Sequence, residues 1–153
     1  MVSVTPKLGV MPAADPLALD RQVCFALAAA SRTVISLYRP VLEPLGLTHP
    51  QYLVMLALWE RSPRTLRDIG ETLALESATL SPLLKRLEAA GLVTRKRKID
   101  DERSLDVELT GAGRALRARA EAVPAQIVTR LGMPITELEA TRDALTRLLA
   151  AAS

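Results

Sequence analysis

Cysteine, histidine and aromatic residues are scarce in this chain of 153 residues. It has one cysteine and one histidine, and aromatic side chains make up 3% of it. One cysteine excludes an internal disulfide framework and a multi-cysteine metal site, and a single histidine argues further against zinc. The 49% hydrophobic content is mostly Leu, Ala and Val, which favours packed helices over a β-sandwich.

Long apolar runs and enzyme motifs are also absent from the sequence. No apolar run reaches the roughly 18 residues needed to cross a bilayer, and the N-terminus lacks the charged and then apolar pattern of an export signal. These absences predict a cytoplasmic protein with no membrane partner. No glycine-rich phosphate loop and no pair of nucleophile and base can be identified, so we expect neither an enzyme nor a bound cofactor.

The sequence does contain a small cluster of cations. The net charge is only +3, so the chain is not a polybasic coat for nucleic acid. Four consecutive basic residues occupy positions 95–98, and Lys85 and Arg86 lie shortly before them. Such clustering in a nearly neutral chain indicates one confined anion-binding surface.

Residues 76–91 are predicted to form a helix with two different faces. One face is an apolar stripe at helical spacing, made of Leu80, Leu83, Leu84 and Leu87. The other face combines small, hydroxyl-bearing and basic side chains, namely Ala78, Ser81, Lys85 and Arg86. Gly91 is the expected C-terminal cap. Short hydrogen-bonding groups followed by cations suit a DNA groove flanked by phosphates.

The neighbouring segments complete a winged helix-turn-helix. Residues 65–73 are predicted to form a short helix with Thr65 as N-cap and Asp68 as the acid of an approximate capping box. Residues 92–98 and 104–109 alternate as two strands do, joined by a turn at 99–103. Taken singly, the leucine stripe is explained as core and the basic strand as a solvated face. The ordered combination instead favours a mainly α protein that binds double-stranded DNA and carries a two-stranded β wing.

The flanking segments predict one domain with a helical dimerisation region. Residues 1–15 show little periodicity and are expected to be a flexible tail, and residues 16–153 to be a single domain. Within it, residues 48–110 are the expected DNA-binding region, and residues 16–47 and 111–153 the expected dimerisation helices. The reason is that the first helix carries two adjacent apolar stripes, which is more than its own core requires.

Local signals set the expected helix boundaries. Thr48 is expected to open a central apolar helix with a capping box. Thr110 is expected to cap a helix that runs to about residue 131 and bends at Pro124. Thr136 is expected to open the last helix with another capping box.

In its motifs the chain resembles the MarR family of bacterial winged-helix regulators. The shared motifs are LLKRLEAAGLV at 83–93, DER at 101–103 and LT at 109–110. A narrower resemblance is to the organic-hydroperoxide-resistance regulators, repressors that sense peroxides by oxidising one cysteine near the start of the first helix. Its motifs are CFAL at 24–27, LYRP at 37–40, LGLT at 45–48 and PQYLVML at 50–56.

The narrower resemblance implies roles for particular residues. Cys24 matches the sensing cysteine and Tyr38 one of the tyrosines that hold it from the other subunit, while His49 stands where a second tyrosine is expected. The DNA contacts that the resemblance implies are Ser77, Thr79 and Ser81 of the recognition helix and the wing pair Asp101 and Arg103. The clustered cations Lys85, Arg86 and Arg95 are expected to bind DNA as well. Arg103 is expected to enter the minor groove, with Asp101 orienting its guanidinium.

Helix spacing adds a requirement for two subunits. Cys24 and Tyr38 share one stripe but lie 14 residues apart, which is about 21 Å along a helix. They cannot touch within one chain. Two first helices that cross antiparallel near Ser31 would bring Cys24 of one subunit level with Tyr38 of the other, as the resemblance implies.

These features predict a homodimeric repressor on a near-palindromic operator, released when an organic hydroperoxide oxidises Cys24. Since the chain has no second cysteine, oxidised Cys24 is expected to react with a low-molecular-weight thiol. The alternative is a MarR-type repressor released by a small lipophilic or aromatic ligand. A thiol peroxidase and an inert helical interaction module explain less, because neither accounts for the wing.

Overall fold

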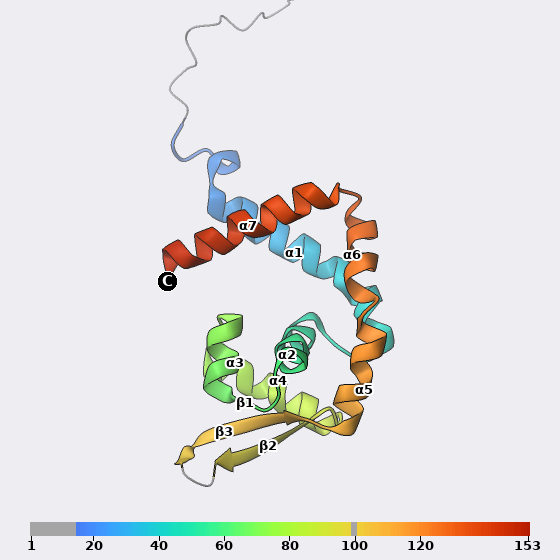
Figure 1. The fold of residues 1–153 in the computed structure, drawn as a ribbon. Helices are drawn as coiled ribbons and strands as arrows, with labels where there is room; N and C mark the ends of the chain where they lie inside the picture. Colours follow the sequence, from blue (N-terminus) through green and yellow to red (C-terminus); the bar gives the residue numbers. More distant parts are fainter. Residues whose placement is uncertain (1–14, 99–100) are drawn as a thin grey trace, which may run out of the picture. The chain divides into compact units, whose positions relative to one another are not determined.

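The computed structural model describes residues 15–98 and 101–153, with Lys98 and residues 101–103 described by their backbone alone. The expected tail therefore lies outside the described residues, apart from Asp15. The chain divides into two compact units, one ending at Ser36 and the other running from Leu37 to Ser153. Helices predominate beside one three-stranded antiparallel sheet (Figure 1), which confirms the prediction of a mainly α winged helix.

The first unit contains the 3-10 turn η1 (Leu19–Arg21) and most of helix α1 (Val23–Leu42). None of residues 15–36 is buried. Five large apolar side chains of this unit are instead exposed, namely Leu17, Leu19, Val23, Phe25 and Ile35. In a single chain this unit therefore has no core of its own.

The second unit begins with the end of α1 and the central helix α2. Pro40 lies within α1 without ending it, and the 3-10 turn η2 (Glu43–Leu45) follows. Helix α2 (His49–Glu60) opens with the predicted capping box, because the Thr48 hydroxyl accepts from the Gln51 N–H and the Gln51 side chain accepts from the Thr48 N–H. This prediction is confirmed. Half of the residues of α2 are buried, and four of them belong to the hydrophobic core, so α2 forms the centre of the core.

The segment expected to bind DNA follows the predicted order of elements (Figure 1). Helix α3 (Leu66–Leu73) and helix α4 (Ser77–Ala89) form the helix-turn-helix, and strands β2 (Val93–Lys98) and β3 (Asp101–Leu109) form the wing. The four leucines of the α4 stripe are all buried, as predicted. Gly91 adopts a φ of +76° just after the helix, which is the backbone conformation that favours glycine.

The sheet differs from the prediction in two ways. A third strand, β1 (Arg64–Thr65), pairs antiparallel with β3 so that the strand order is β1-β3-β2. Strand β3 begins at Asp101 and not at residue 104, so the predicted turn at 99–103 was too long. Residues 99 and 100 lie outside the described part of the chain.

Two predicted capping boxes are wrong. The Thr65 hydroxyl does accept from the Asp68 N–H, but the Asp68 carboxylate binds Arg61 and Arg64 in place of the Thr65 N–H. The last helix, α7 (Ile135–Ala152), starts before Thr136, with Pro134 as its N-cap and no side-chain cap.

The helix predicted between Thr110 and residue 131 is divided into two. Helix α5 (Gly111–Ala120) is capped by Thr110 as predicted, and helix α6 (Val123–Leu131) follows with Pro124 in its first turn. Proline fits a helix start because it has no N–H to leave unpaired. The predicted bend is thus a break just before Pro124.

No residue of α7 is buried in the single chain, and Leu145, Leu148 and Leu149 are exposed. Over residues 15–98 and 101–153, no helix combines the length and the apolar character needed to cross a membrane.

Candidate nucleic-acid interface

Helix α4 presents the predicted polar face. Ser77, Thr79, Lys85 and Arg86 are exposed and Ser81 is half-buried. Burial of the leucine stripe on the opposite side fixes the rotation of the helix, because turning it would expose those leucines. Neither Lys85 nor Arg86 forms an ion pair with another described residue. Both cations are therefore available to phosphates.

The connection from α3 to α4 is tight. Ala74 ends α3 in the left-handed conformation, with φ 54° and ψ 44°. The Leu75 N–H donates to the Gly70 carbonyl at 2.9 Å. A Cβ at Gly70 would lie 2.9 Å from the Leu75 carbonyl oxygen, so only glycine allows this close approach. The turn thus sets the spacing of the two helices.

Strand β2 brings its cations beside the recognition helix. Arg95 is held there by Glu88 of α4: the Arg95 N–H donates to Glu88 Oε2 at 3.1 Å, and Arg95 Nη2 donates to Glu88 Oε1 at 3.0 Å. The hydrogen bond from Arg95 is the main reason why the pKa of Glu88 is lowered. Arg95 Nε is buried and has no hydrogen-bond partner among the described residues. Arg95 therefore braces the wing against α4.

The remaining wing residues are only partly described. Lys96 and Arg97 are exposed on β2. Asp101 and Arg103 belong to β3 by their backbone, but their side chains lie outside the described part of the structure. Their predicted contacts with the minor groove therefore stay predictions. Sequence reasoning did not identify Glu88, whose only signal is that it is an acid on an otherwise basic helix face.

The structure places two of the three predicted sensing residues together. The rings of Tyr38 and His49 meet edge to face with centroids 4.8 Å apart, and the Tyr52 ring lies 5.9 Å from that of Tyr38. Burial lowers the pKa of His49 and raises the pKa values of both tyrosines. The neutral imidazole is thus favoured here. Cys24 lies in the other unit, exposed at the second position of α1.

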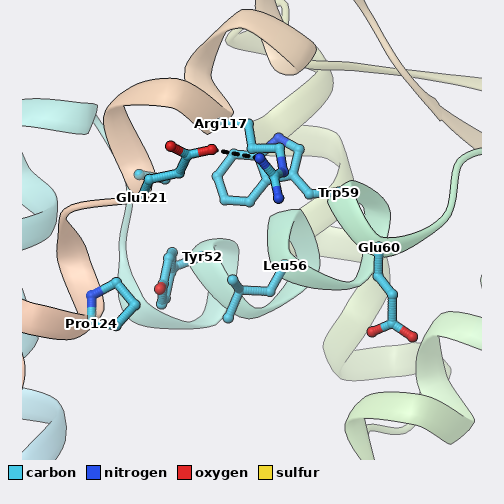
Figure 2. Close-up of a pocket in the computed structure, with 8 residues that line it drawn as sticks. Tyr52, Leu56, Trp59, Glu60, Arg117, Glu121 and Pro124 are labelled. Carbon is cyan, nitrogen blue, oxygen red and sulfur yellow. Dashed lines mark hydrogen bonds and ion pairs between the residues drawn. The ribbon is translucent and has the colours of Figure 1, made fainter.

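An open pocket of about 460 Å³ lies between α2 and the α5–α6 region. Tyr52, Leu56 and Trp59 line it from α2, and Figure 2 shows the ion pair between Arg117 and Glu121 on its other side. The Trp59 indole N–H donates to the Gly113 carbonyl at 2.8 Å, so the ring is fixed in place. The pocket is mainly apolar, with Arg117 and Glu121 on one side and Glu60 of α2 at another edge.

No group of three histidine, cysteine, aspartate or glutamate side chains is arranged to hold a metal in the described part of the chain. The arrangement that remains is a helix-turn-helix whose second helix exposes hydroxyls and cations, next to a basic wing. Together these define a DNA-binding transcriptional regulator of the winged-helix class.

A sequence profile of the SarA/Rot family of transcriptional regulators matches residues 36–119. The chain is also 42% identical over 135 residues to the organic hydroperoxide resistance transcriptional regulator of Bacillus subtilis (strain 168), which covers 88% of this chain and 92% of that protein. The chain therefore belongs to the SarA/Rot family of winged-helix regulators. The Bacillus relative is a transcriptional regulator, in line with the predicted class of this chain.

Solved structures agree with this assignment. Overoxidized AbfR bound to DNA, a Staphylococcus epidermidis protein, superimposes with a TM-score of 0.71 at 38% identity, covering 88% of this chain and 95% of AbfR. CouR from Rhodococcus jostii RHA1, bound to p-coumaroyl-CoA, gives a TM-score of 0.73 at 28% identity, covering 86% of this chain and 94% of CouR. Other structural neighbours are MarR-family regulators, so the predicted resemblance to that family is confirmed.

Proposed function

We propose that the protein is a homodimeric repressor that leaves its operator when an organic hydroperoxide oxidises Cys24. The observation that carries the proposal is the position of this thiol, because the single cysteine of the chain is exposed in the first turn of α1. Two relatives support it. One is an organic hydroperoxide resistance regulator, and AbfR has been crystallised in reduced, overoxidized and disulfide forms.

The proposed chemistry begins with attack of the Cys24 sulfur on the peroxide O–O bond. The thiol becomes a sulfenic acid while the hydroperoxide is reduced to the alcohol. A low-molecular-weight thiol then condenses with the sulfenic acid, giving a mixed disulfide and water. The sulfenic acid is more polar than the thiol and the mixed disulfide is bulkier, so either product disturbs the proposed packing of Cys24 against the partner subunit.

The aromatic cluster formed by Tyr38, His49 and Tyr52 is the proposed contact site for Cys24 of the other subunit. Tyr38 supplies a hydroxyl that can donate to sulfur, and His49 stands beside it. Because burial favours the neutral imidazole, we assign His49 to packing and hydrogen bonding and not to a charge pair with the thiolate.

DNA reading is assigned to the recognition helix and the wing. Ser77, Thr79 and Ser81 are proposed to face base edges, and Lys85 and Arg86 to bind phosphates. Arg103, oriented by Asp101, is proposed to enter the minor groove. A two-fold dimer presents two such units, so the operator is expected to be a near-palindrome with half-sites about one helical turn apart.

The test is a gel shift on the DNA upstream of the protein's own gene. Cumene hydroperoxide with a small thiol should release the native protein, whereas Cys24→Ser should stay bound under the same treatment. Release of Cys24→Ser by oxidant, or a native protein that ignores the peroxide, would refute the thiol mechanism.

The pocket of Figure 2 favours a second candidate, release by a lipophilic or aromatic ligand. CouR was crystallised with an aromatic acyl thioester, which supports this alternative. Under this alternative an aromatic acid releases native protein and Cys24→Ser equally, and Leu56→Trp, which fills the pocket, abolishes the response.

A further inference from the structure

Arg64 is a charged residue buried in the DNA-binding region. Its side chain is only 6% exposed. A buried guanidinium is costly unless its N–H groups are satisfied. Here all three of its nitrogens have partners, one on α2 and two on α3.

The three hydrogen bonds of Arg64 connect two helices. Nη1 donates to the Ala57 carbonyl in the last turn of α2 at 2.9 Å. Nε donates to Asp68 Oδ2 at 2.6 Å and Nη2 donates to the Thr72 hydroxyl at 2.9 Å, so the guanidinium holds α3 at both of its turns. Arg61 also donates to Asp68 Oδ2, at 2.7 Å, but is largely exposed.

The backbone of Arg64 makes a further connection to the wing. As part of β1, Arg64 pairs with Val107 of β3. Helix α3 in turn contacts the recognition helix, since Gly70 faces the buried Leu80 side chain. One residue therefore joins the end of α2, the helix-turn-helix and the base of the wing.

Helix α2 is also the element that begins at the aromatic cluster. His49 is its first residue and Tyr52 lies in its first turn, both next to Tyr38. Ala57, whose carbonyl Arg64 binds, lies on the same helix about 12 Å further along its axis at 1.5 Å per residue. A helix is a stiff element that can carry a displacement from one end to the other.

We propose that Arg64 is a positioning residue that fixes α3, and through it the recognition helix α4, relative to the end of α2, so that a displacement of α2 alters DNA binding. The part that concerns the oxidant response rests on the proposed function. Arginine suits the role because its planar fork binds three acceptors in fixed directions, which neither lysine nor an apolar side chain can do.

The experiment compares Arg64→Met and Arg64→Lys with a matched control, Arg67→Met. Arg67 is an arginine on the same helix-turn-helix, but it is 90% exposed and pairs only with Glu71 among the described residues. Binding to a fluorescent duplex from upstream of the protein's own gene is measured by anisotropy at several salt concentrations. Each protein is measured reduced and after cumene hydroperoxide with a small thiol.

Arg64→Met should bind DNA more weakly in the reduced form without changing the dependence of affinity on salt, since no phosphate contact is lost. Its ratio of oxidised to reduced dissociation constants should fall by about fivefold or more, the scale of a typical allosteric coupling. The affinity of Arg64→Lys and its ratio of oxidised to reduced dissociation constants should lie between those of the native protein and Arg64→Met. Arg67→Met should keep the native ratio.

A folded Arg64→Met protein with native affinity and native ratio would overturn the proposal. So would a salt slope reduced by about 0.9 for each arginine removed, since that indicates a direct phosphate contact. If Arg64→Met does not fold by circular dichroism, Thr72→Val takes its place, because it removes one hydrogen bond and leaves those to Ala57 and Asp68. If the native protein does not respond to peroxide, the proposed function is refuted but the role of Arg64 is not. The affinity and the salt slope of Arg64→Met then decide that role.

Discussion

Ala74 holds the helix-turn-helix connection in a left-handed backbone conformation, with φ 54°. Such a conformation costs an L-residue roughly 1–2 kcal/mol. Glycine avoids this cost but lowers the free energy of unfolding by about 0.5–1 kcal/mol, because it gives the unfolded chain more conformational freedom. We expect Ala74→Gly to raise the free energy of unfolding by up to about 1 kcal/mol in urea denaturation. Gly70→Ala, by contrast, should destabilise the protein, because its Cβ would meet the Leu75 carbonyl. A destabilised Ala74→Gly would show that the strain is absent.

His49 gives the protein a defined dependence of stability on pH. Burial lowers its pKa in the folded chain below the 6.5 of an unperturbed histidine, so the unfolded chain takes up the proton first as the pH falls. The contribution of the neutral imidazole is thus complete above pH 6.5 and is lost as the pH falls through the lower folded pKa. We expect the stability of His49→Gln to depend less on pH than that of the native protein as the pH falls below about 6.5. Parallel stability curves for the two proteins would contradict this.

At the scale of elements, the recognition helix and the wing use their arginines differently. Arg86 of α4 is exposed, while Arg95 of β2 is bound to Glu88. Each phosphate contact contributes about 0.9 to the slope of log affinity against log salt. Arg86→Gln should therefore lower the slope of a dimer by about 2, and Arg95→Gln should weaken binding with the slope nearly unchanged. Equal slope changes for the two variants would mean that Arg95 leaves Glu88 to bind phosphate.

The sequence was sufficient for the elements that repeat a signal over several residues. The α4 stripe repeats four leucines at helical spacing, and the α2 capping box has both of its residues at the required distance. Strand β1 could not be found in this way, because two residues show no alternation and their pairing depends on β3, more than 40 positions further along.

Among the site residues too, those with a repeated local signal were predicted and those that depend on distant partners were not. The exposed face of α4 was predicted because it is the complement of the buried stripe. Arg64 was not singled out and Arg95 was expected to contact DNA, because a sequence does not distinguish a cation that binds phosphate from one that an acid or carbonyl of another element holds. Asp68 lies only four residues after Arg64, but the Ala57 carbonyl and the Glu88 carboxylate reach these arginines through the packing of separate elements.

At the scale of the whole molecule, α7 has an apolar edge that no other part of the described chain buries. Leu145, Leu148 and Leu149 lie on one side of the helix and are exposed. We expect the native protein to sediment as a dimer at micromolar concentration and Leu148→Glu with Leu149→Glu to shift it to monomer. Ala150→Glu, on the opposite side of the same helix, should leave the dimer intact. A native monomer would remove the basis for dimerisation and for the proposed contact of Cys24 with a second subunit.

Strand β1 is paired only with the part of β3 next to α5, at Asp106 and Val107. From Asp101 to Leu105 the neighbour of β3 is β2 alone. Amide hydrogen exchange should therefore be slowest at Val107, which is fully buried, and faster at Leu105, where the hairpin can open without separating β1. The base of β3 is thus paired on both sides and its outer part on one side only, so a wing that enters the minor groove, as proposed, can adapt to groove width while the helix-turn-helix stays folded.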